Sequence, residues 1–189
     1  MTPTPLPPLE YLQEALEICL YSPSGLRWKK RPRYHFNTNR GHKISNTKHF
    51  KKQAGGIGKS GDGDLRYMVK INQSRFCCHR VVFALNYNKD PWPNEIDHID
   101  GNSINNRPEN LRIATRSENA CNKARPQNNT SGRIGVTFCK RTQMWMAQIG
   151  LNGKNIFLGR YNKIENAMLA REQAEQKHHG VFSGNICRF

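Results

Sequence analysis

The sequence predicts an α+β protein built from small modules in series. Apolar residues make up only 36% of the 189 residues, so each core must be small. Short segments with helical spacing alternate with short segments of strand-like alternation. Ala124 to Gly132 is polar and contains Pro and Gly, which marks the best domain boundary. We therefore expect an N-terminal basic region at 1–75, a central hairpin-and-helix module at 76–125, and at 126–189 a three-stranded antiparallel sheet packed on one helix.

The charge balance points to a polyanionic partner. Thirty Lys and Arg against fourteen Asp and Glu leave a net charge of +16, which favours nucleic acid as the partner. A merely basic surface or a ribosome-associated protein remains the alternative. No apolar run approaches the ~18 to 20 residues of a membrane span, and the N-terminus lacks the features of a signal peptide. We expect no membrane partner and a location in the cytoplasm, that of the host cell if the chain is phage-encoded.

The N-terminal residues predict a helix, a hairpin and a basic segment. Apolar residues recur at helical spacing from about Leu9 to Tyr21. The turn formers S-P-S-G come next, and a strand-like run then ends at Trp28. Lys29 to Lys52 is polar and basic, and its sequence fits a solvated loop and a phosphate-contacting arm equally well.

The next segment predicts a strand pair and a helix. Leu65 to Ile71 alternates as a strand, residues 72–74 form a turn, and residues 75–78 form the return strand. The helix begins near His79 and ends before Pro91.

The stretch from 95 to 122 has an unusual density of Asp, His and Asn. It predicts a strand at Ile96 to Ile99, a turn around Asp100 to Asn102 and a second strand at Leu111 to Ala114. A helix then follows, capped by Ser117 and carrying Asn119. Core packing alone would hardly require this composition.

The same stretch holds the residue types that phosphodiester hydrolysis needs. A neutral histidine can activate water, and oxygen ligands can hold Mg²⁺ at the phosphate. Asp97, His98 and Asn119 supply these types. Alternation along a strand directs Asp97 and His98 to opposite sides, so that one can hold metal while the other faces water. Asn110 is expected to pin the hairpin through side-chain hydrogen bonds to the backbone, and thereby to orient His98.

Three submotifs, D-H-I-D-G-N, N-N-R-P-E-N-L-R and S-E-N-A-C-N, resemble in order and spacing an HNH endonuclease of the phage and group I intron homing type. The resemblance implies a ββα-metal fold with His98 as general base. It also implies Asp97 and Asn119 as ligands of a single Mg²⁺ or Mn²⁺, and Asn110 as the structural asparagine. The third motif position holds Asn119 rather than His, which makes tight binding of softer metals less favourable.

Several neighbouring residues have two interpretations. Asp100 fits a turn better than a metal site, because Asp-Gly is ordinary turn chemistry. Arg116 could clamp the phosphate or be solvated. His79 fits a packed or supporting residue better than a catalytic one. His178 and His179 would complement the dipole at the C-terminal end of a helix.

The C-terminal segment predicts three strands and a helix. The strands are expected at Ile134 to Phe138, Met144 to Ile149 and Asn155 to Leu158. The Asn-Gly pair at 152–153 is a strong hairpin signal, and alanines at 167, 170 and 174 suit a helix at Ile164 to His178 that packs on the sheet. Alternation assigns Trp145 and its i+2 neighbours at 147 and 149 to the helix-packed face.

Residues 131–182 resemble the three-stranded DNA-binding domain of plant ethylene-response factors. The likeness is carried by G-V, W-x-A-x-I and L-G-x-Y, and it implies a sheet face that enters the major groove. Candidate base or sugar contacts are Arg133, Thr137, Gln148, Asn155 and Phe157, and candidate phosphate contacts are Lys140, Arg141, Lys154 and Arg160. Several arginines of the plant domains are replaced here by Ile134, Thr137, Cys139 and Gly150, so their sequence preference does not transfer. A small domain with merely solvated basic residues is the alternative.

Together these patterns predict a metal-dependent endonuclease that hydrolyses phosphodiester bonds in double-stranded DNA, as a site-specific homing or phage enzyme. It would act as a monomer or as a dimer assembled on DNA. The rival hypothesis from another class is a non-catalytic, sequence-specific DNA-binding regulator. A third is an RNA-binding basic protein, which the N-terminal basic segment supports.

Overall fold

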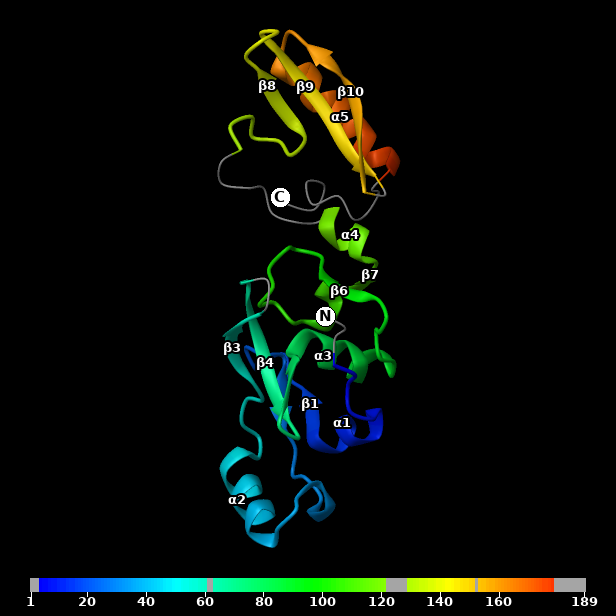
Figure 1. The fold of residues 1–189 in the computed structure, drawn as a ribbon. Helices are drawn as coiled ribbons and strands as arrows, with labels where there is room; N and C mark the ends of the chain where they lie inside the picture. Colours follow the sequence, from blue (N-terminus) through cyan, green and yellow to red (C-terminus); the bar gives the residue numbers. More distant parts are fainter. Residues whose placement is uncertain (1–3, 61–62, 122–128, 152, 179–189) are drawn as a thin grey trace. The chain divides into compact units, whose positions relative to one another are not determined.

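The computed structural model describes residues 4–60, 63–121, 129–151 and 153–178. It confirms the α+β class: small antiparallel sheets combine with helices, including a C-terminal three-stranded sheet packed on a helix (Figure 1). The chain divides into two compact units, one of residues 1–98 with 102–113 and the other of residues 99–101 with 114–189. No described helix is both long and apolar enough to cross a membrane.

The first unit opens with helix α1 (Leu9–Ala15) and a small hairpin of β1 (Leu16–Ile18) and β2 (Leu26–Trp28). The predicted helix to Tyr21 was therefore too long. Leu16 pairs with Trp28 across the hairpin, and both side chains are buried. Strand pairing thus overrides the helical spacing of the leucines, which serve the core in either conformation.

The basic segment contains a short 3₁₀ helix, η1 (Arg33–His35), and helix α2 (Asn39–His49). The sequence had predicted a loop or an arm. The helix starts after Thr38, whose Oγ1 accepts a hydrogen bond from the Gly41 backbone N–H at 3.0 Å. No residue of α2 is buried, so the helix leaves no apolar stripe in the sequence by which periodicity could reveal it.

A three-stranded antiparallel sheet follows, ordered β3 (Gly56–Lys59), β4 (Leu65–Ile71) and β5 (Ser74–Cys77). Helix α3 (Cys78–Tyr87) begins directly after it, as predicted, and ends at Asn88 in a left-handed conformation. One core includes Leu12, Leu16, Leu26, Val69, Val81, Val82 and Leu111. These residues come from both sides of the expected boundary at 75/76, so the two segments share a core, and the division into three functional modules stays a prediction.

Strands β6 (Glu95–His98) and β7 (Leu111–Ala114) form a two-stranded sheet, and a short 3₁₀ helix, η2 (Pro108–Asn110), leads into β7. This hairpin agrees with the sequence prediction to within one residue at each end. Helix α4 (Arg116–Cys121) follows and belongs to the second unit.

The second unit contains β8 (Val136–Cys139), β9 (Met144–Leu151), β10 (Lys154–Tyr161) and helix α5 (Ile164–His178). The strands form an antiparallel sheet in the order β10, β9, β8, and α5 packs on it. Ala147 and Ile149 are fully buried and Trp145 packs on the same core, which confirms the predicted face. Most of the expected linker, Asn152 of the predicted turn and His179 lie outside the described residues.

Candidate active site

Strand β6 carries Asp97 and His98 at consecutive positions, and only 3% and 8% of their surfaces are exposed. Asp97 forms an ion pair with Arg112 on β7: the Arg112 Nη2 and Nε atoms lie 2.6 and 2.7 Å from the Asp97 Oδ2 atom. A buried carboxylate is costly without such a partner. Arg112 therefore fixes both the carboxylate and the pairing of the two strands. Sequence reasoning did not single out Arg112, although it lies on the strand predicted to face Asp97.

The imidazole of His98 is oriented by Asn106, a residue that the sequence analysis also missed. The Asn106 Nδ2 atom donates a hydrogen bond to the Ser24 backbone carbonyl at 3.0 Å. The Oδ1 atom therefore faces His98 and lies 3.3 Å from its Nε2 atom. Since an amide oxygen only accepts hydrogen bonds, Nε2 carries the proton of the neutral ring. The basic nitrogen of His98 is then Nδ1.

The turn between β1 and β2 packs against Asn106. Gly25 has a φ of +79°, and a Cβ atom added there would lie 3.1 Å from the Asn106 Cβ atom and from a Val82 methyl group. Only glycine combines this conformation with such a close approach. The S-P-S-G turn, predicted from its composition alone, therefore also supports the active-site hairpin.

His79 of α3 packs edge-to-face on His98, with ring centroids 4.9 Å apart and planes at 82°. Burial lowers the pKa of His79 well below its usual value, and nearby His98, Arg66 and Arg80 lower the pKa further. Its Nδ1 atom has no hydrogen-bond partner among the described residues. His79 is thus a neutral, packed ring behind His98, which agrees with the supporting role favoured from the sequence.

Asn110 ends η2, and its Nδ2 atom donates a hydrogen bond to the Asn105 carbonyl at 2.9 Å. This side-chain bond to backbone is of the kind predicted, and a second asparagine of the same loop, Asn106, lies at hydrogen-bond distance from His98. Asn110 therefore shapes the loop that carries Asn106, and its importance for catalysis stays a prediction.

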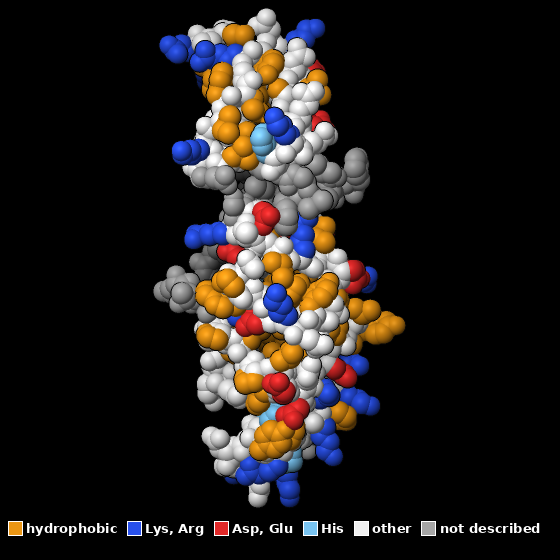
Figure 2. All heavy atoms as spheres, turned by 90° about the vertical axis from the view of Figure 1, so that its right-hand side faces the viewer, with side chains coloured by type: hydrophobic (Ala, Val, Ile, Leu, Met, Phe, Trp, Pro, Cys, Tyr) orange, Lys and Arg blue, Asp and Glu red, His pale blue; other side chains and the backbone are white. Residues whose placement is uncertain are grey.

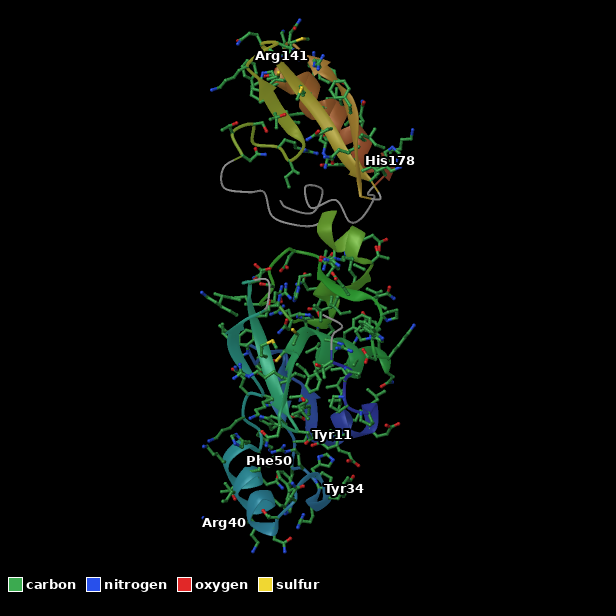
Figure 3. The ribbon with its side chains drawn as sticks, in the orientation of Figure 1. Tyr11, Tyr34, Arg40, Phe50, Arg141 and His178 are labelled. Carbon is green, nitrogen blue, oxygen red and sulfur yellow. The ribbon has the colours of Figure 1, made fainter. Side chains whose placement is uncertain are left out.

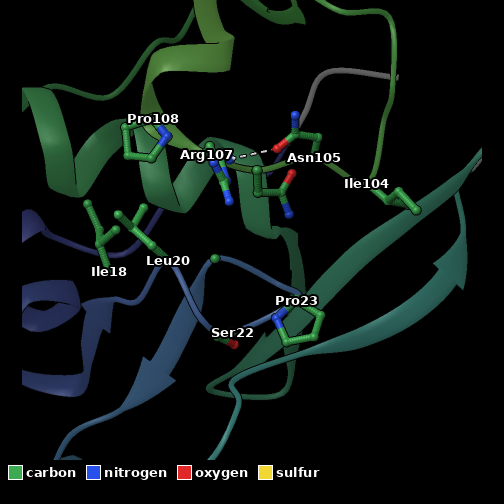
Figure 4. A pocket seen from close by; sticks show the side chains of 10 residues that line it. Ile18, Leu20, Ser22, Pro23, Ile104, Asn105, Arg107 and Pro108 are labelled. Carbon is green, nitrogen blue, oxygen red and sulfur yellow. Dashed lines mark hydrogen bonds between the residues drawn. The ribbon is translucent and has the colours of Figure 1, made fainter.

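A small cavity of about 140 Å³ lies beside this loop. Its lining includes Ser22, Pro23 and Gly25 of the first hairpin and residues 104–108, which lie between β6 and β7 (Figure 4). Within the loop, the Arg107 backbone N–H is 3.5 Å from the Asn105 Oδ1 atom. The cavity lies between this loop and the β1–β2 turn, and Asn106 connects the two through its hydrogen bond to the Ser24 carbonyl.

The second metal-ligand candidate, Asn119, lies on α4 in the second unit. The cap of this helix is Thr115 rather than the predicted Ser117, which lies within the helix. Thr115 Oγ1 accepts from the Glu118 backbone N–H at 3.2 Å, and Glu118 Oε2 accepts from the Thr115 N–H at 2.7 Å. This capping box fixes the start of the helix. Arg116 is exposed at its first position, and the phosphate contact predicted for Arg116 stays a prediction.

Most of the predicted DNA contacts of the second unit lie on one sheet face. Cross-strand neighbours share a face, and Gln148 pairs with Phe157 while Met146 lies between Thr137 and Arg160. Because these residues alternate with buried Ala147 and Ile149, they occupy the face opposite α5. Lys140 and Arg141 are exposed at the turn between β8 and β9 (Figure 3), and Lys154 and Asn155 are exposed at the start of β10.

Arg133 differs from the other candidates. Its Nη2 atom is 2.6 Å from Glu175 Oε2, and Glu175 Oε1 is 2.9 Å from the Nε atom of Arg171. Arg171 also donates to the Gln148 carbonyl at 3.0 Å. Glu175 is 1% exposed, so this Arg-Glu-Arg triad is buried between α5 and the sheet. The structure thus places Arg133 in the packing of the domain.

Residues 77–121 match the HNH endonuclease family. Protein 3.8 of Escherichia phage T7 is 44% identical over 59 residues, which cover 31% of this chain and 49% of that protein. An uncharacterised HNH endonuclease of Acanthamoeba polyphaga mimivirus is 37% identical over 73 residues, or 38% of this chain and 36% of the relative. The chain thus spans about half the length of the first relative and about a third of the second. No solved structure matches the chain significantly.

The matched segment begins at the end of β5 and ends with α4, so it contains His79, Asp97, His98, Asn106, Asn110, Arg112 and Asn119. The family match therefore covers the same segment in which the structure places the candidate site residues. Residues 77–121 are thus the part of this chain that is similar to HNH endonucleases.

Proposed function

We propose that the chain is a metal-dependent endonuclease that hydrolyses phosphodiester bonds in duplex DNA, as a site-specific homing or phage enzyme. The observation that carries this proposal is the orientation of His98. Its Nε2–H is directed to the Asn106 amide oxygen, and Asp97 is its immediate neighbour. A nuclease needs a base of this kind beside a carboxylate.

In the proposed reaction, Nδ1 of His98 accepts a proton from the water that attacks phosphorus. The bond from phosphorus to the leaving 3′-oxygen then breaks, and the product strand carries a 5′-phosphate. The Asn106 amide oxygen stabilises the imidazolium that forms, because it accepts from Nε2–H throughout. The buried, neutral His79 keeps the ring in place and adds no charge to oppose protonation of His98.

A hard divalent cation suits the donor set that the family implies. Among the described residues, no three His, Cys, Asp or Glu side chains cluster as a metal site. The Asp97 carboxylate and the Asn119 amide oxygen are donors that Mg²⁺ or Mn²⁺ accepts, with water completing the shell. When bound there, one such ion would polarise the phosphate and stabilise the leaving oxygen.

The outer face of the β8–β10 sheet would hold the duplex. Thr137, Gln148, Asn155 and Phe157 are exposed or half-buried there, and the Arg160 guanidinium carbon lies 5.6 Å from the centre of the Phe157 ring. A face with amide, aromatic and cationic groups can contact bases and phosphates. One hydrolytic site per chain fits nicking by a monomer, or cleavage of both strands by a dimer assembled on DNA.

The test is plasmid cleavage. Supercoiled DNA incubated with the purified chain and Mg²⁺ should become nicked or linear, a chelator should abolish this, and the His98→Ala chain should leave the plasmid supercoiled while still binding it. Equal cleavage by both chains would overturn the assignment. Tight, specific binding without any metal-dependent product would favour the rival, a non-catalytic DNA-binding regulator.

A further inference from the structure

Helix α2 lies outside the segment similar to HNH endonucleases and has no part in the chemistry above. It belongs to residues 29–52, which contain six Lys and three Arg and no Asp or Glu. None of these nine cations forms an ion pair with a described carboxylate. Positive charges that lie close together without carboxylate partners repel one another, and a bound anion relieves this repulsion. Such a cluster therefore indicates a surface that binds an anion.

The inner face of α2 is bound to the first unit by polar contacts. The Asn46 side chain accepts from the Arg31 backbone N–H and donates to the Arg31 carbonyl, both at 2.9 Å. The Arg31 guanidinium is hydrogen-bonded to Ser45 and lies 4.4 and 4.5 Å from the ring centres of Trp28 and Phe36. These contacts attach α2 to Arg31, and no residue of the helix is buried in an apolar core.

The outer face of α2 carries Arg40, Lys43, Thr47 and Lys48, all exposed and spaced at i, i+3, i+7 and i+8. We call Arg40, Lys43 and Lys48 the α2 basic face. Arg40 lies at the outer edge of the helix in Figure 3, and Figure 2 shows Lys and Arg side chains around the end of the unit where α2 lies. From Arg40 to Lys48 the helix rises about 12 Å, the rise of about three to four nucleotides of one DNA strand.

The surroundings of the helix reinforce the positive potential. Burial lowers the pKa of His49, and neighbouring Lys48, Arg31 and Lys52 lower the pKa further. An open cleft of about 790 Å³ lies between α2 and the β4–β5 turn, and Arg31, His49 and Lys70 contribute to its lining. Cations are thus present on the outer face of the helix and in the cleft beside it.

We propose that α2 is a docking helix for duplex DNA, and that the α2 basic face contacts the phosphate backbone away from the scissile bond. The inference rests on the proposed function only for the choice of DNA as the polyanion. A fixed helix with an exposed cationic row suits a regular duplex backbone, and the contact would carry affinity without base sequence.

The experiment measures binding of a 30-base-pair duplex by the full-length chain in chelator, over a range of KCl concentrations. The variant Arg40→Gln/Lys43→Gln/Lys48→Gln should lower the steepness of log affinity against log salt by about 2 to 3 and weaken binding roughly tenfold to a hundredfold at 0.15 M salt. The matched control, Lys59→Gln/Arg75→Gln/Lys89→Gln, removes three exposed charges of the same unit outside α2. It should change affinity by less than about threefold.

The charge-preserving variant Arg40→Lys/Lys43→Arg/Lys48→Arg should bind DNA like the wild type, and its result separates lost charge from lost folding. In the wild type, DNA should also raise the pKa of His49, followed by NMR, and the α2 variant should lose that response. Equal weakening in the α2 and control variants would overturn the proposal. So would tighter, α2-dependent binding of a structured RNA of the same length.

The readout separates this inference from the proposed function. A chain that binds DNA through α2 but never cleaves it would contradict the nuclease assignment and leave the docking helix standing. A chain that cleaves DNA but binds it equally well without the α2 basic face would support the nuclease assignment and contradict the docking helix.

Discussion

The β6–β7 hairpin and the outer face of the β8–β10 sheet use polar residues in opposite ways. In the hairpin, Asp97 and His98 are buried and bound to Arg112 and Asn106. On the sheet face, Asn155 and Phe157 project into solvent. Buried, mutually bonded groups hold a fixed geometry, which chemistry requires, whereas exposed groups adapt to a partner. The comparison teaches that substitutions in the hairpin should change rate, and substitutions on the sheet face should change affinity.

The largest effect on stability should come from beneath the sheet face. Glu175→Ala leaves Arg133 and Arg171 without their buried carboxylate, which should destabilise the second unit by about 3–5 kcal/mol. Denaturant unfolding followed by the NMR signal of the Trp145 indole N–H, which reports on the second unit, would measure this loss. Glu172→Ala, on the same helix but outside the triad, is the control and should cost less than about 1 kcal/mol. Equal stability of the two variants would show that the triad does not support the sheet.

In the hairpin, Asn106→Ala should reduce cleavage by roughly ten- to a hundredfold, because His98 loses the group that fixes its tautomer. The hydrogen bond to the buried Ser24 carbonyl is lost at the same time, which should cost about 1–3 kcal/mol of stability because the carbonyl is left without this donor. DNA affinity should stay unchanged, and the pH profile of cleavage should move. Asn86→Ala, exposed on α3, is the control. A loss of affinity with an unchanged rate would contradict the assigned role of Asn106.

On the sheet face, Gln148→Ala and Phe157→Ala should each weaken DNA binding by about 1 kcal/mol or somewhat more, and leave the rate at saturating DNA unchanged. Fluorescence anisotropy and single-turnover cleavage measure the two quantities. Leu169→Ala, exposed on α5, is a control on the other side of the sheet. Slower cleavage at saturation would contradict the separation between the two regions.

The smallest effect at neutral pH concerns His79. Its folded-state pKa is depressed well below the usual value, so the folded chain resists protonation while the unfolded chain takes up the proton. Above the pKa of histidine in the unfolded chain, about 6.5, His79 does not lower the free energy of unfolding. Below that pH, the free energy of unfolding falls because only the unfolded chain binds the proton. His79→Gln should unfold with less dependence on pH between about 6.5 and 5 than the wild type. The same pH dependence in both chains would show that His79 is not the group responsible.

The sequence predicted the elements whose patterns are local. Strand β7 and helix α5 appear with the predicted bounds, because alternation and the alanine stripe are visible within each segment. Helix α2 could not be found this way, since it buries no residue and is held by Asn46 on Arg31. The end of the first helix at Ala15 could not be predicted from local spacing either, because it depends on pairing of β1 with a strand that begins ten residues further on.

The candidate site shows the same division. Asp97, His98 and Asn110 stand in a recognisable order, and their positions in the fold agree with their motif. Asn106 looked like one more loop asparagine. Its role depends on Ser24, 82 residues away in the chain, and on a glycine that lets the first hairpin approach. Local patterns cannot contain such a contact. The roles assigned to Arg116, Asn119 and the sheet-face residues stay predictions.

The most direct test of the central claim is rescue of His98→Ala by added imidazole. Single-turnover cleavage by this variant with Mg²⁺ should fall by roughly 10²- to 10⁴-fold, because the proton acceptor is lost. Free imidazole should restore part of the rate, in proportion to its neutral fraction, and should not restore the Asn119→Ala variant, which keeps its base. Two results would contradict the role of His98 as the general base. One is that His98→Ala cleaves at the wild-type rate without imidazole, and the other is that imidazole accelerates both variants equally.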